Sequence, residues 1–262
     1  MNDLTFEIRP LERVFGPLEP ADGENLVDAI YREVRSRIVD LSLPPDMPLS
    51  EKDLAAVFEA SKTPVREALI RLSRDGLVRV VPKSGTFVAP ISLDKYLEAV
   101  FIRERLETGC VLRLASVGLS NAQIVRIRAL LASQAEAYEA EDFVLVFRLD
   151  DQFHQTLFEF AGIAGAWVLM NSAKAEIDRV RRLKNRLGIR RKDAVMDEHS
   201  AIVDALIEKD GLRAEEAMRN NIGAFEEELG YLSNHPKFLD TLDSFNELVN
   251  LQRKGRRSRK LF

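Results

Sequence analysis

In the first third of the chain, short segments with regularly spaced apolar residues alternate with breaks in that spacing. This pattern predicts a small domain of helices and strands. Apolar residues recur every four positions in the first segment, which is the spacing of one helix face. A hydroxyl residue before a proline predicts the start of another helix at Thr63-Pro64. The expected elements are helices over Glu24–Leu41, Ser50–Phe58 and Thr63–Asp75, then β-branched strands over Leu77–Val81 and Thr86–Val88. Together they make a winged helix-turn-helix.

Beyond the proline-containing boundary Ala89–Ser92, the apolar spacing is helical throughout. The expected helices are Leu93–Ser116, Ser120–Ala140, Asp142–Phe160, Ala166–Leu187, Asp193–Lys209 and Leu212–Leu232. Short connections between helices with almost no strand signal are typical of an antiparallel bundle. The predicted fold class is therefore mainly α, with an N-terminal winged helix-turn-helix and a C-terminal all-helical bundle.

These patterns divide the chain into four parts. We expect an irregular arm over residues 1–22, the winged domain over 23–90, the bundle over 91–232 and an extension over 233–262. The segment Gln252–Phe262 carries six Lys and Arg side chains, and we expect it to be disordered. Two interpretations of this basic tail stand side by side: added non-specific affinity for DNA, or an unbound solubilising end.

Composition narrows the class of protein without deciding its function. The chain has 262 residues, 46% of them hydrophobic, and a formal net charge of −4, which does not suit a protein that coats nucleic acid. Sequence-specific binding needs only a local basic face. The single cysteine, Cys110, excludes an intrachain disulfide, and its apolar neighbours predict a buried structural role for it. With no apolar run of membrane-spanning length, a soluble cytoplasmic protein is expected.

One end of the helix that begins at Thr63 is suited to reading DNA. Ser61, Lys62, Thr63 and Arg66 cluster at its N-terminal end, the end that a recognition helix inserts into the major groove. Arginine can bind guanine O6 and N7 in a bidentate way, and hydroxyl groups suit phosphates. Lys83, at the tip of the predicted wing, can reach an adjacent phosphate or the minor groove. For any one residue an ordinary solvated side chain is the simpler interpretation, but the ordered cluster favours DNA.

The bundle holds a second set of polar residues that can be brought together. Asp150 and His154 are four residues apart on one helix face, and His199 opens a later helix. Carboxylate and imidazole groups from separate helices form metal sites in bundle interiors, although histidines in helical domains are more often ordinary surface or core residues. Arg103 has two interpretations: a clamp for a carboxylate inside the bundle, or a surface ion pair with Glu107.

Taken together, these motifs resemble the GntR family of bacterial transcription regulators, in particular its FadR-like branch with an FCD effector domain. The N-terminal resemblance covers residues 24–90 and is most specific over Ser61–Leu69 and Gly85–Val88. It implies that the following residues face DNA: Lys52, Ser61, Lys62, Thr63, Arg66 and Gly85. Lys62 stands where the family usually has arginine, which favours a phosphate contact over a bidentate base contact.

The resemblance of residues 94–231 to FCD domains implies a divalent metal held by one Asp and three His residues. Three of these ligands map onto Asp150, His154 and His199, but the fourth falls on Asn221. Because an amide oxygen is a poorer ligand than imidazole for zinc or nickel, we expect a weakened site for Zn, Ni or Mn. The alternatives are a water in the fourth position, or a metal-free site that holds the effector directly.

The resemblance also implies a small organic acid as effector, bound between the metal and an arginine. Arg103 fits this role by position, Arg179 and Arg182 are further candidates, and Asp151 replaces Asp150 as ligand if the helix register differs. The resulting hypothesis is a homodimeric repressor that binds a pseudo-palindromic operator and is not an enzyme. A metal-dependent hydrolase and a constitutive architectural DNA-binding protein are the alternatives from other classes.

Overall fold

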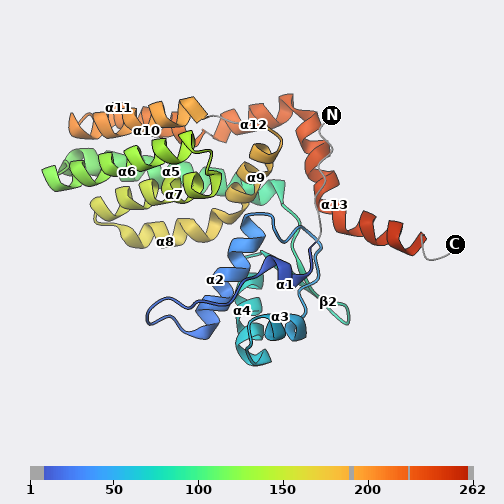
Figure 1. The fold of residues 1–262 in the computed structure, drawn as a ribbon. Helices are drawn as coiled ribbons and strands as arrows, with labels where there is room; N and C mark the ends of the chain where they lie inside the picture. Colours follow the sequence, from blue (N-terminus) through green and yellow to red (C-terminus); the bar gives the residue numbers. More distant parts are fainter. Residues whose placement is uncertain (1–8, 189–191, 224, 259–262) are drawn as a thin grey trace. The chain divides into compact units, whose positions relative to one another are not determined.

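The computed structural model describes residues 9–188, 192–223 and 225–258 of the chain. The chain divides into two compact units. The first comprises Met1–Tyr96, Ala175–Gly188 and Leu232–Phe262, and the second comprises Leu97–Lys174 and Ile189–Tyr231. The fold is mainly α with one two-stranded ribbon, as predicted (Figure 1).

The first unit contains the predicted winged helix-turn-helix. Its elements are α2 (Leu26–Val39), α3 (Glu51–Val57), α4 (Lys62–Arg74), β1 (Val78–Val81) and β2 (Gly85–Val88). Ser50 is the N-cap of α3, where its side-chain oxygen accepts a hydrogen bond from the Asp53 backbone N–H at 3.3 Å. Helix α4 begins one residue earlier than expected, so Pro64 lies inside its first turn, where the missing backbone N–H costs nothing.

The wing, formed by β1 and β2, is anchored by backbone hydrogen bonds to the rest of the winged helix-turn-helix, which is called the head below. β1 and β2 pair antiparallel, from Val78 opposite Val88 to Val81 opposite Gly85. The segment before α3 joins the far edge of β2, since Val88 N–H donates to the Met47 carbonyl at 2.9 Å and Leu49 N–H donates to the Thr86 carbonyl at 2.8 Å. The edge strand is thereby covered and the turn between the strands is held in a fixed direction.

The core of the head is formed mainly by α2 and α4, with contributions from the N-terminal arm. Ile30, Val34 and Leu72 have no exposed surface, and burying each stabilises the head by about 1.5–3 kcal/mol. The arm is not wholly irregular as expected: α1 (Leu11–Val14) is a single helical turn. Phe15, which follows it, is 6% exposed and its ring centroid lies 4.9 Å from that of Phe58, an edge-to-face contact.

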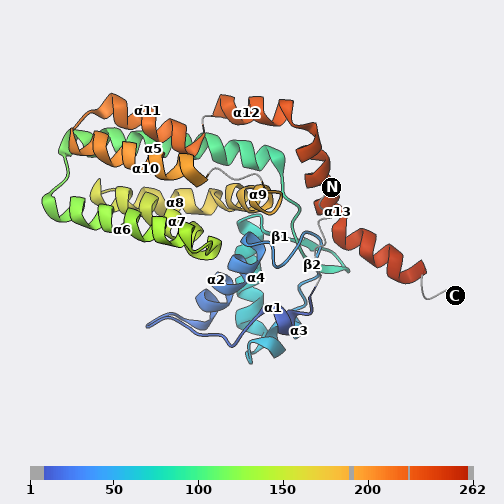
Figure 2. The same ribbon diagram turned by 45° about the horizontal axis from the view of Figure 1, so that its top comes forward.

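The second unit is a helical bundle (Figure 2). Its helices are α5 (Leu93–Val117, which begins in the first unit), α6 (Asn121–Glu139), α7 (Phe143–Phe160), α8 (Ala164–Ala173), α10 (Lys192–Ile207), α11 (Gly211–Ile222) and most of α12 (Phe225–Asn234). Helix α6 starts with a capping box between Ser120 and Gln123. A large core that includes Phe153, Leu157 and Ile202 holds most of the bundle together, and a smaller cluster of Ala137, Val146 and Leu149 joins α6 to α7.

Two helices that were expected to be continuous are interrupted. Ala166–Leu187 is split at Lys174 into α8 and α9 (Ala175–Arg186), and the buried Lys174 ammonium forms an ion pair with Asp151. Leu212–Leu232 is split at Gly223, whose φ of 77° favours glycine. After this break, the Phe225 backbone N–H donates to Glu104 Oε2 at 3.2 Å, so a helix start is satisfied by a carboxylate from α5.

The C-terminal extension is helical further than expected. Helix α13 covers Pro236–Ser258, so the backbone of most of the basic tail continues a helix, while residues 259–262 and the tail's side chains lie outside the described part of the structure. Asn246 on α13 donates to the Ile91 carbonyl at 3.0 Å and accepts from the Ile91 N–H at 2.8 Å. Among the helices described, none combines the length and apolar character that crossing a bilayer requires.

Candidate functional site

The seven residues expected to face DNA are all exposed, and they lie on three neighbouring parts of the head. They are Lys52 on α3, Ser61, Lys62, Thr63 and Arg66 at the start of α4, and, in the wing, Lys83 in the turn and Gly85 at the start of β2. Ser61 occupies the N-cap position of α4 without a side-chain capping bond, so its hydroxyl is not committed to the helix start. Lys83 has a φ of 61°, within the tight turn that presents it at the wing tip.

Arg66 is the exposed arginine of this face, and its guanidinium is already oriented. Arg66 Nε donates to Glu51 Oε1 at 3.0 Å and Nη2 donates to Glu51 Oε2 at 2.8 Å. The hydrogen bonds to Glu51 raise the pKa of Arg66 above its ordinary value, so this group stays charged. A charged and oriented arginine near the N-terminus of α4 has the chemistry required to bind a guanine edge.

The predicted acid and histidine residues meet in the interior of the second unit. Asp150 and His154 lie on α7 and His199 lies on α10, and all three side chains are buried. One possible ligand atom from each lies within 4.8 Å of those of the other two. His199 Nε2 is 3.6 Å from Asp150 Oδ1. This is the donor set that divalent transition metals use in helical bundles.

Both histidines are held by a polar side chain at the opposite ring nitrogen. His154 Nδ1 contacts the Glu107 carboxylate, and His199 Nδ1 is 2.9 Å from Gln134 Oε1. Because a carboxylate or amide oxygen accepts hydrogen bonds, the N–H at Nδ1 of each ring would donate to it, and Nε2 would be the nitrogen left for a ligand. A carboxylate or carbonyl behind a histidine is the usual support of a metal ligand, so these residues fit a metal ion.

Arg103 lies next to this cluster and not on the surface. It is 4% exposed, and its Nε donates to Glu107 Oε1 at 2.6 Å. The surface interpretation of the Arg103–Glu107 pair is therefore wrong, because the pair is buried. Arg103 Nη2 is 3.0 Å from His154 Nε2, which is the same nitrogen that would bind a metal.

The ionisation states of Glu107 and Cys110, which lie near this cluster, follow from their burial and from the charges of neighbouring groups. Burial alone would raise the pKa of Glu107, but Arg103 and His154 hold that pKa at about 2, so the carboxylate remains ionised at neutral pH. Burial, followed by the charge of Glu107, raises the pKa of Cys110 to about 12. This thiol stays protonated, which supports the structural role expected for it.

Other predicted residues lie in different surroundings. Asn221 donates from Nδ2 to Glu198 Oε2 at 3.2 Å, so its contact is with the residue preceding His199. Asp151 pairs with Lys174, which leaves Asp150 as the carboxylate of the cluster. Arg179 and Arg182 are on α9 in the first unit, where Arg179 donates to the Ala89 carbonyl at 2.7 Å and pairs with Glu176. These contacts give Arg179 a role in holding the segment after the wing.

Sequence reasoning missed the two supporting residues. The sequence predicts Glu107 only as a surface partner of Arg103, although its position four residues after Arg103, on a helix with apolar positions at helical spacing, is a signal for a pair on one helix face. Gln134 is fully buried between the apolar positions Leu131 and Ala137 of α6. An amide on the apolar face of a helix is unusual and indicates a specific buried partner.

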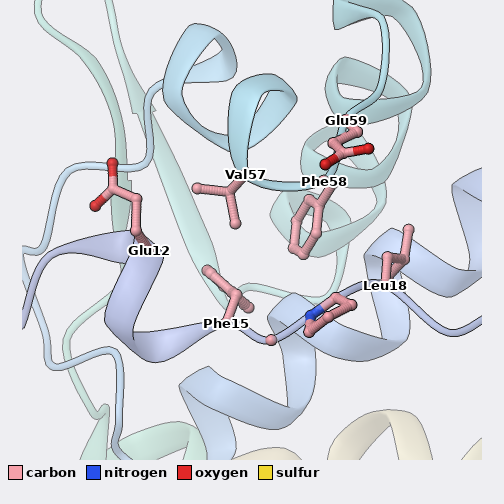
Figure 3. A pocket seen from close by; sticks show the side chains of 8 residues that line it. Glu12, Phe15, Leu18, Val57, Phe58 and Glu59 are labelled. Atoms are coloured by element: carbon pink, nitrogen blue, oxygen red, sulfur yellow. The ribbon is translucent and has the colours of Figure 1, made fainter.

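A surface pocket also lies in the head, between the N-terminal arm and the end of α3. It has a volume of about 400 Å³ and is lined by Glu12, Phe15, Gly16, Pro17, Leu18, Val57, Phe58 and Glu59. Figure 3 shows the Phe15 and Phe58 side chains between Glu12 and Glu59, which lie at opposite sides. It includes none of the predicted site residues.

A winged head with an exposed basic helix start, joined to a helical domain with a buried acid and histidine cluster, defines the class of winged-helix DNA-binding proteins. Residues 26–88 match the family model described as bacterial regulatory proteins, gntR family, and residues 98–224 match that of the FCD domain. The chain belongs to the GntR family and is a DNA-binding transcription regulator, not an enzyme. The hydrolase alternative is therefore wrong.

Known relatives agree with this assignment. The chain is 32% identical to the HTH-type transcriptional repressor RspR of Escherichia coli over 217 residues, which cover 83% of this chain and 92% of the relative. A putative GntR regulator from a Rhodococcus species has a solved structure with a TM-score of 0.65 and 25% identity, covering 78% of this chain and 97% of that one. E. coli McbR shares the fold, with a TM-score of 0.67 and 19% identity over 80% of this chain and 98% of that one.

Proposed function

We propose that this regulator is a homodimeric, cytoplasmic repressor whose helical domain binds a small carboxylate metabolite. The observation that carries the proposal is the buried meeting of Asp150, His154 and His199 beside the guanidinium of Arg103. Four polar side chains that share an apolar interior are costly to bury unless they serve a ligand or a specific network. In a transcription regulator, such a ligand controls the affinity for DNA.

The residues of the cluster have separate roles in this proposal. Asp150, His154 and His199 would hold a Zn, Ni or Mn ion, and the ion would supply positive charge for the carboxylate of the effector. Arg103 would donate to the same carboxylate, as a planar guanidinium does in a bidentate pair. Glu107 and Gln134 keep both imidazole rings in the tautomer that presents Nε2.

The residues expected to face DNA would have two roles: most would position the head on the phosphate backbone, and one would read a base. Lys52, Ser61, Lys62, Thr63, Lys83 and the backbone at Gly85 would contact phosphates, while Arg66 reads a base edge. Two copies related by a two-fold axis would read the two halves of a pseudo-palindromic operator. An effector that binds one arrangement of the two heads more tightly than another would shift the affinity for that operator. The name of the relative RspR supports repression as the output.

The test of metabolite sensing is a thermal-shift screen of the full-length protein with small organic acids, with and without Zn, Ni or Mn. A bound acid at 100 times its Kd adds about 2.7 kcal/mol to the free energy of unfolding. We expect at least one carboxylate to raise the melting temperature and to change the affinity for DNA. If no acid shifts the melting temperature under any metal condition, the sensing proposal fails.

A metal-free regulator is a second candidate, and one contact favours it. His154 Nε2 has a single lone pair, and Arg103 Nη2 already lies 3.0 Å from it. In this version Arg103, His154 and His199 bind the effector directly. The metal content of tag-free protein distinguishes the two: near one ion per chain supports the metal site, while no ion after incubation with excess Zn, Ni or Mn supports direct binding.

Replacing Gln134 with leucine should lower the affinity for the metal by about 10- to 100-fold, because His199 loses the partner that fixes its tautomer. Gln134 is preferable to Arg103 or Glu107 as a target, since removing either member of that buried pair leaves an uncompensated charge. The measurement is isothermal titration of Zn into metal-stripped protein. Gln152→Leu, at an exposed position two residues before His154, is the control. Equal affinities in the two variants would contradict the role of Gln134.

A further inference from the structure

The contact between Glu51 and Arg66 joins the two helices of the helix-turn-helix at the surface expected to face DNA. Glu51 is the first residue of α3, and Arg66 lies in the second turn of α4, fifteen positions later in the sequence. Both carboxylate oxygens accept hydrogen bonds from one edge of the guanidinium, at 3.0 and 2.8 Å. The Arg66 side chain is 61% exposed and that of Glu51 is 33% exposed, so the pair is open to a ligand.

The hydrogen-bond inventory of arginine shows what this contact leaves available. A guanidinium carries five N–H donors: one on Nε and two on each terminal nitrogen. Glu51 uses the Nε–H and one N–H of Nη2. The second N–H of Nη2 and both N–H groups of Nη1 remain, and the N–H of Nη2 together with the adjacent N–H of Nη1 forms the end of the fork. Two parallel donors at the end of the fork match O6 and N7 of guanine in the major groove.

We propose that Glu51 is a specificity-determining residue that holds Arg66 with the end of its guanidinium directed at a guanine. This inference rests on the proposed role of Arg66 in base reading. An unrestrained arginine side chain can rotate to a phosphate, where it adds affinity for any sequence, whereas an arginine held at its Nε edge keeps one direction. The carboxylate also repels phosphates, so Glu51 lowers affinity for non-specific DNA while raising the preference for the operator.

Glu51 is therefore expected to lower the affinity for non-specific DNA and to raise the preference for the operator. A residue with a merely structural role would not have these opposite effects. The hydrogen bonds from Arg66, with a further contribution from the charge of Lys62, lower the pKa of Glu51, so the carboxylate is ionised under binding conditions. Removing its charge should therefore relieve repulsion from all DNA and at the same time free Arg66. A residue that only supported the fold would, when replaced, weaken binding to every sequence alike.

The experiment begins with the full-length wild-type protein and selection of its operator from a random duplex library. The base read by Arg66 is the position whose preference disappears in Arg66→Ala. Binding constants are then measured for the operator, for the operator with that base pair replaced, and for an operator with 7-deazaguanine, which lacks the N7 acceptor. The variants are Glu51→Gln, which removes the charge, and Glu51→Asp, which keeps the charge on a shorter side chain.

We expect Glu51→Gln to lower the ratio of operator to replaced-base affinity by about 3- to 10-fold, with unchanged or higher affinity for non-specific DNA. Glu51→Asp should lower the same ratio, since the shorter carboxylate no longer spans the edge of Arg66. The 7-deazaguanine operator should show no effect of Glu51→Gln, and neither should the operator in the Arg66→Ala background. Glu67→Gln is the control, because it removes an exposed carboxylate from α4 next to Arg66 in the sequence.

Three results would overturn the inference. Glu51→Gln could raise the affinities for the operator and for the replaced-base operator by the same factor and leave their ratio unchanged. Glu51 would then only shield Arg66 from DNA of any sequence. Both affinities could fall together, which would make it a structural residue. The effect of Glu51→Gln could also persist in the Arg66→Ala background. Failure of the proposed function is distinct: the wild-type protein would then select no consensus, or Arg66→Ala would select the same one.

Discussion

Replacing Arg66 with alanine should remove the preference of the protein for its operator while leaving both units folded. One bidentate arginine–guanine contact is worth about 1–3 kcal/mol of discrimination, so two copies in a dimer would lose about 2–6 kcal/mol. This is the largest effect expected for any single residue of the head. Because Arg66 is exposed and its partner Glu51 is also near the surface, its removal leaves no buried charge behind. Fluorescence anisotropy with operator and scrambled duplexes measures the change.

Salt dependence supplies the control for this expectation. Lys52→Ala, at an exposed position on α3, should weaken binding to both duplexes by a similar factor and reduce the slope of affinity against salt, because it removes a phosphate contact. Arg66→Ala should instead reduce the difference between the duplexes. If Arg66→Ala retains the wild-type preference, then α4 does not read bases through this residue, and the proposed DNA face is wrong.

Replacing His199 with alanine should abolish metal binding by the helical domain. The cluster offers three ligand residues, and the loss of one should reduce affinity by more than the roughly 100-fold known for supporting residues behind a ligand. The stabilisation by metal, about 2.7 kcal/mol at 100 times the wild-type Kd, should disappear with it. Elemental analysis after incubation with Zn, together with melting curves of stripped and loaded protein, gives both quantities.

The third histidine of the chain is a matched control for this measurement. His235 is exposed and lies in the first unit, so His235→Ala should bind metal as the wild type does. His199 also stacks on Phe153 with ring centroids 4.0 Å apart, and its removal will cost stability in the absence of metal as well. The decisive comparison is therefore the change in melting temperature on adding metal to each variant. A His199→Ala protein that still gains stability from Zn would place the metal elsewhere.

The local sequence predicts the helices and strands of the head, because these elements are short and adjacent in the chain, and each has its own capping or strand-forming residues. Ser50 caps α3 as predicted, α4 begins at Lys62, one residue before the predicted start at Thr63, and the two predicted strands pair as a wing. Sequential neighbours packing on each other leave few alternatives for such a unit. The seven predicted DNA-facing residues emerge as one exposed set for the same reason.

The spacing of apolar residues does not predict where the two long helices are interrupted. At Gly223 the chain leaves the helix with a positive φ, and after the break the backbone N–H of Phe225 donates to a carboxylate from α5, that of Glu104. At Lys174 a single residue breaks a continuous apolar stripe, and its ammonium is buried against Asp151. A periodicity spanning both sides of a one-residue break is indistinguishable from one helix.

The sequence by itself determined the fold class, the winged head, and the residues Asp150, His154 and His199, because helical spacing and capping are local properties. Only the tertiary structure decided what surrounds those residues: Glu107 and Gln134 behind the two imidazoles, Arg103 buried beside them, and Arg179 bound to the carbonyl of Ala89. It also decided the pairing of Glu51 with Arg66. Such contacts join residues that are far apart in the chain, and their geometry depends on how the helices pack.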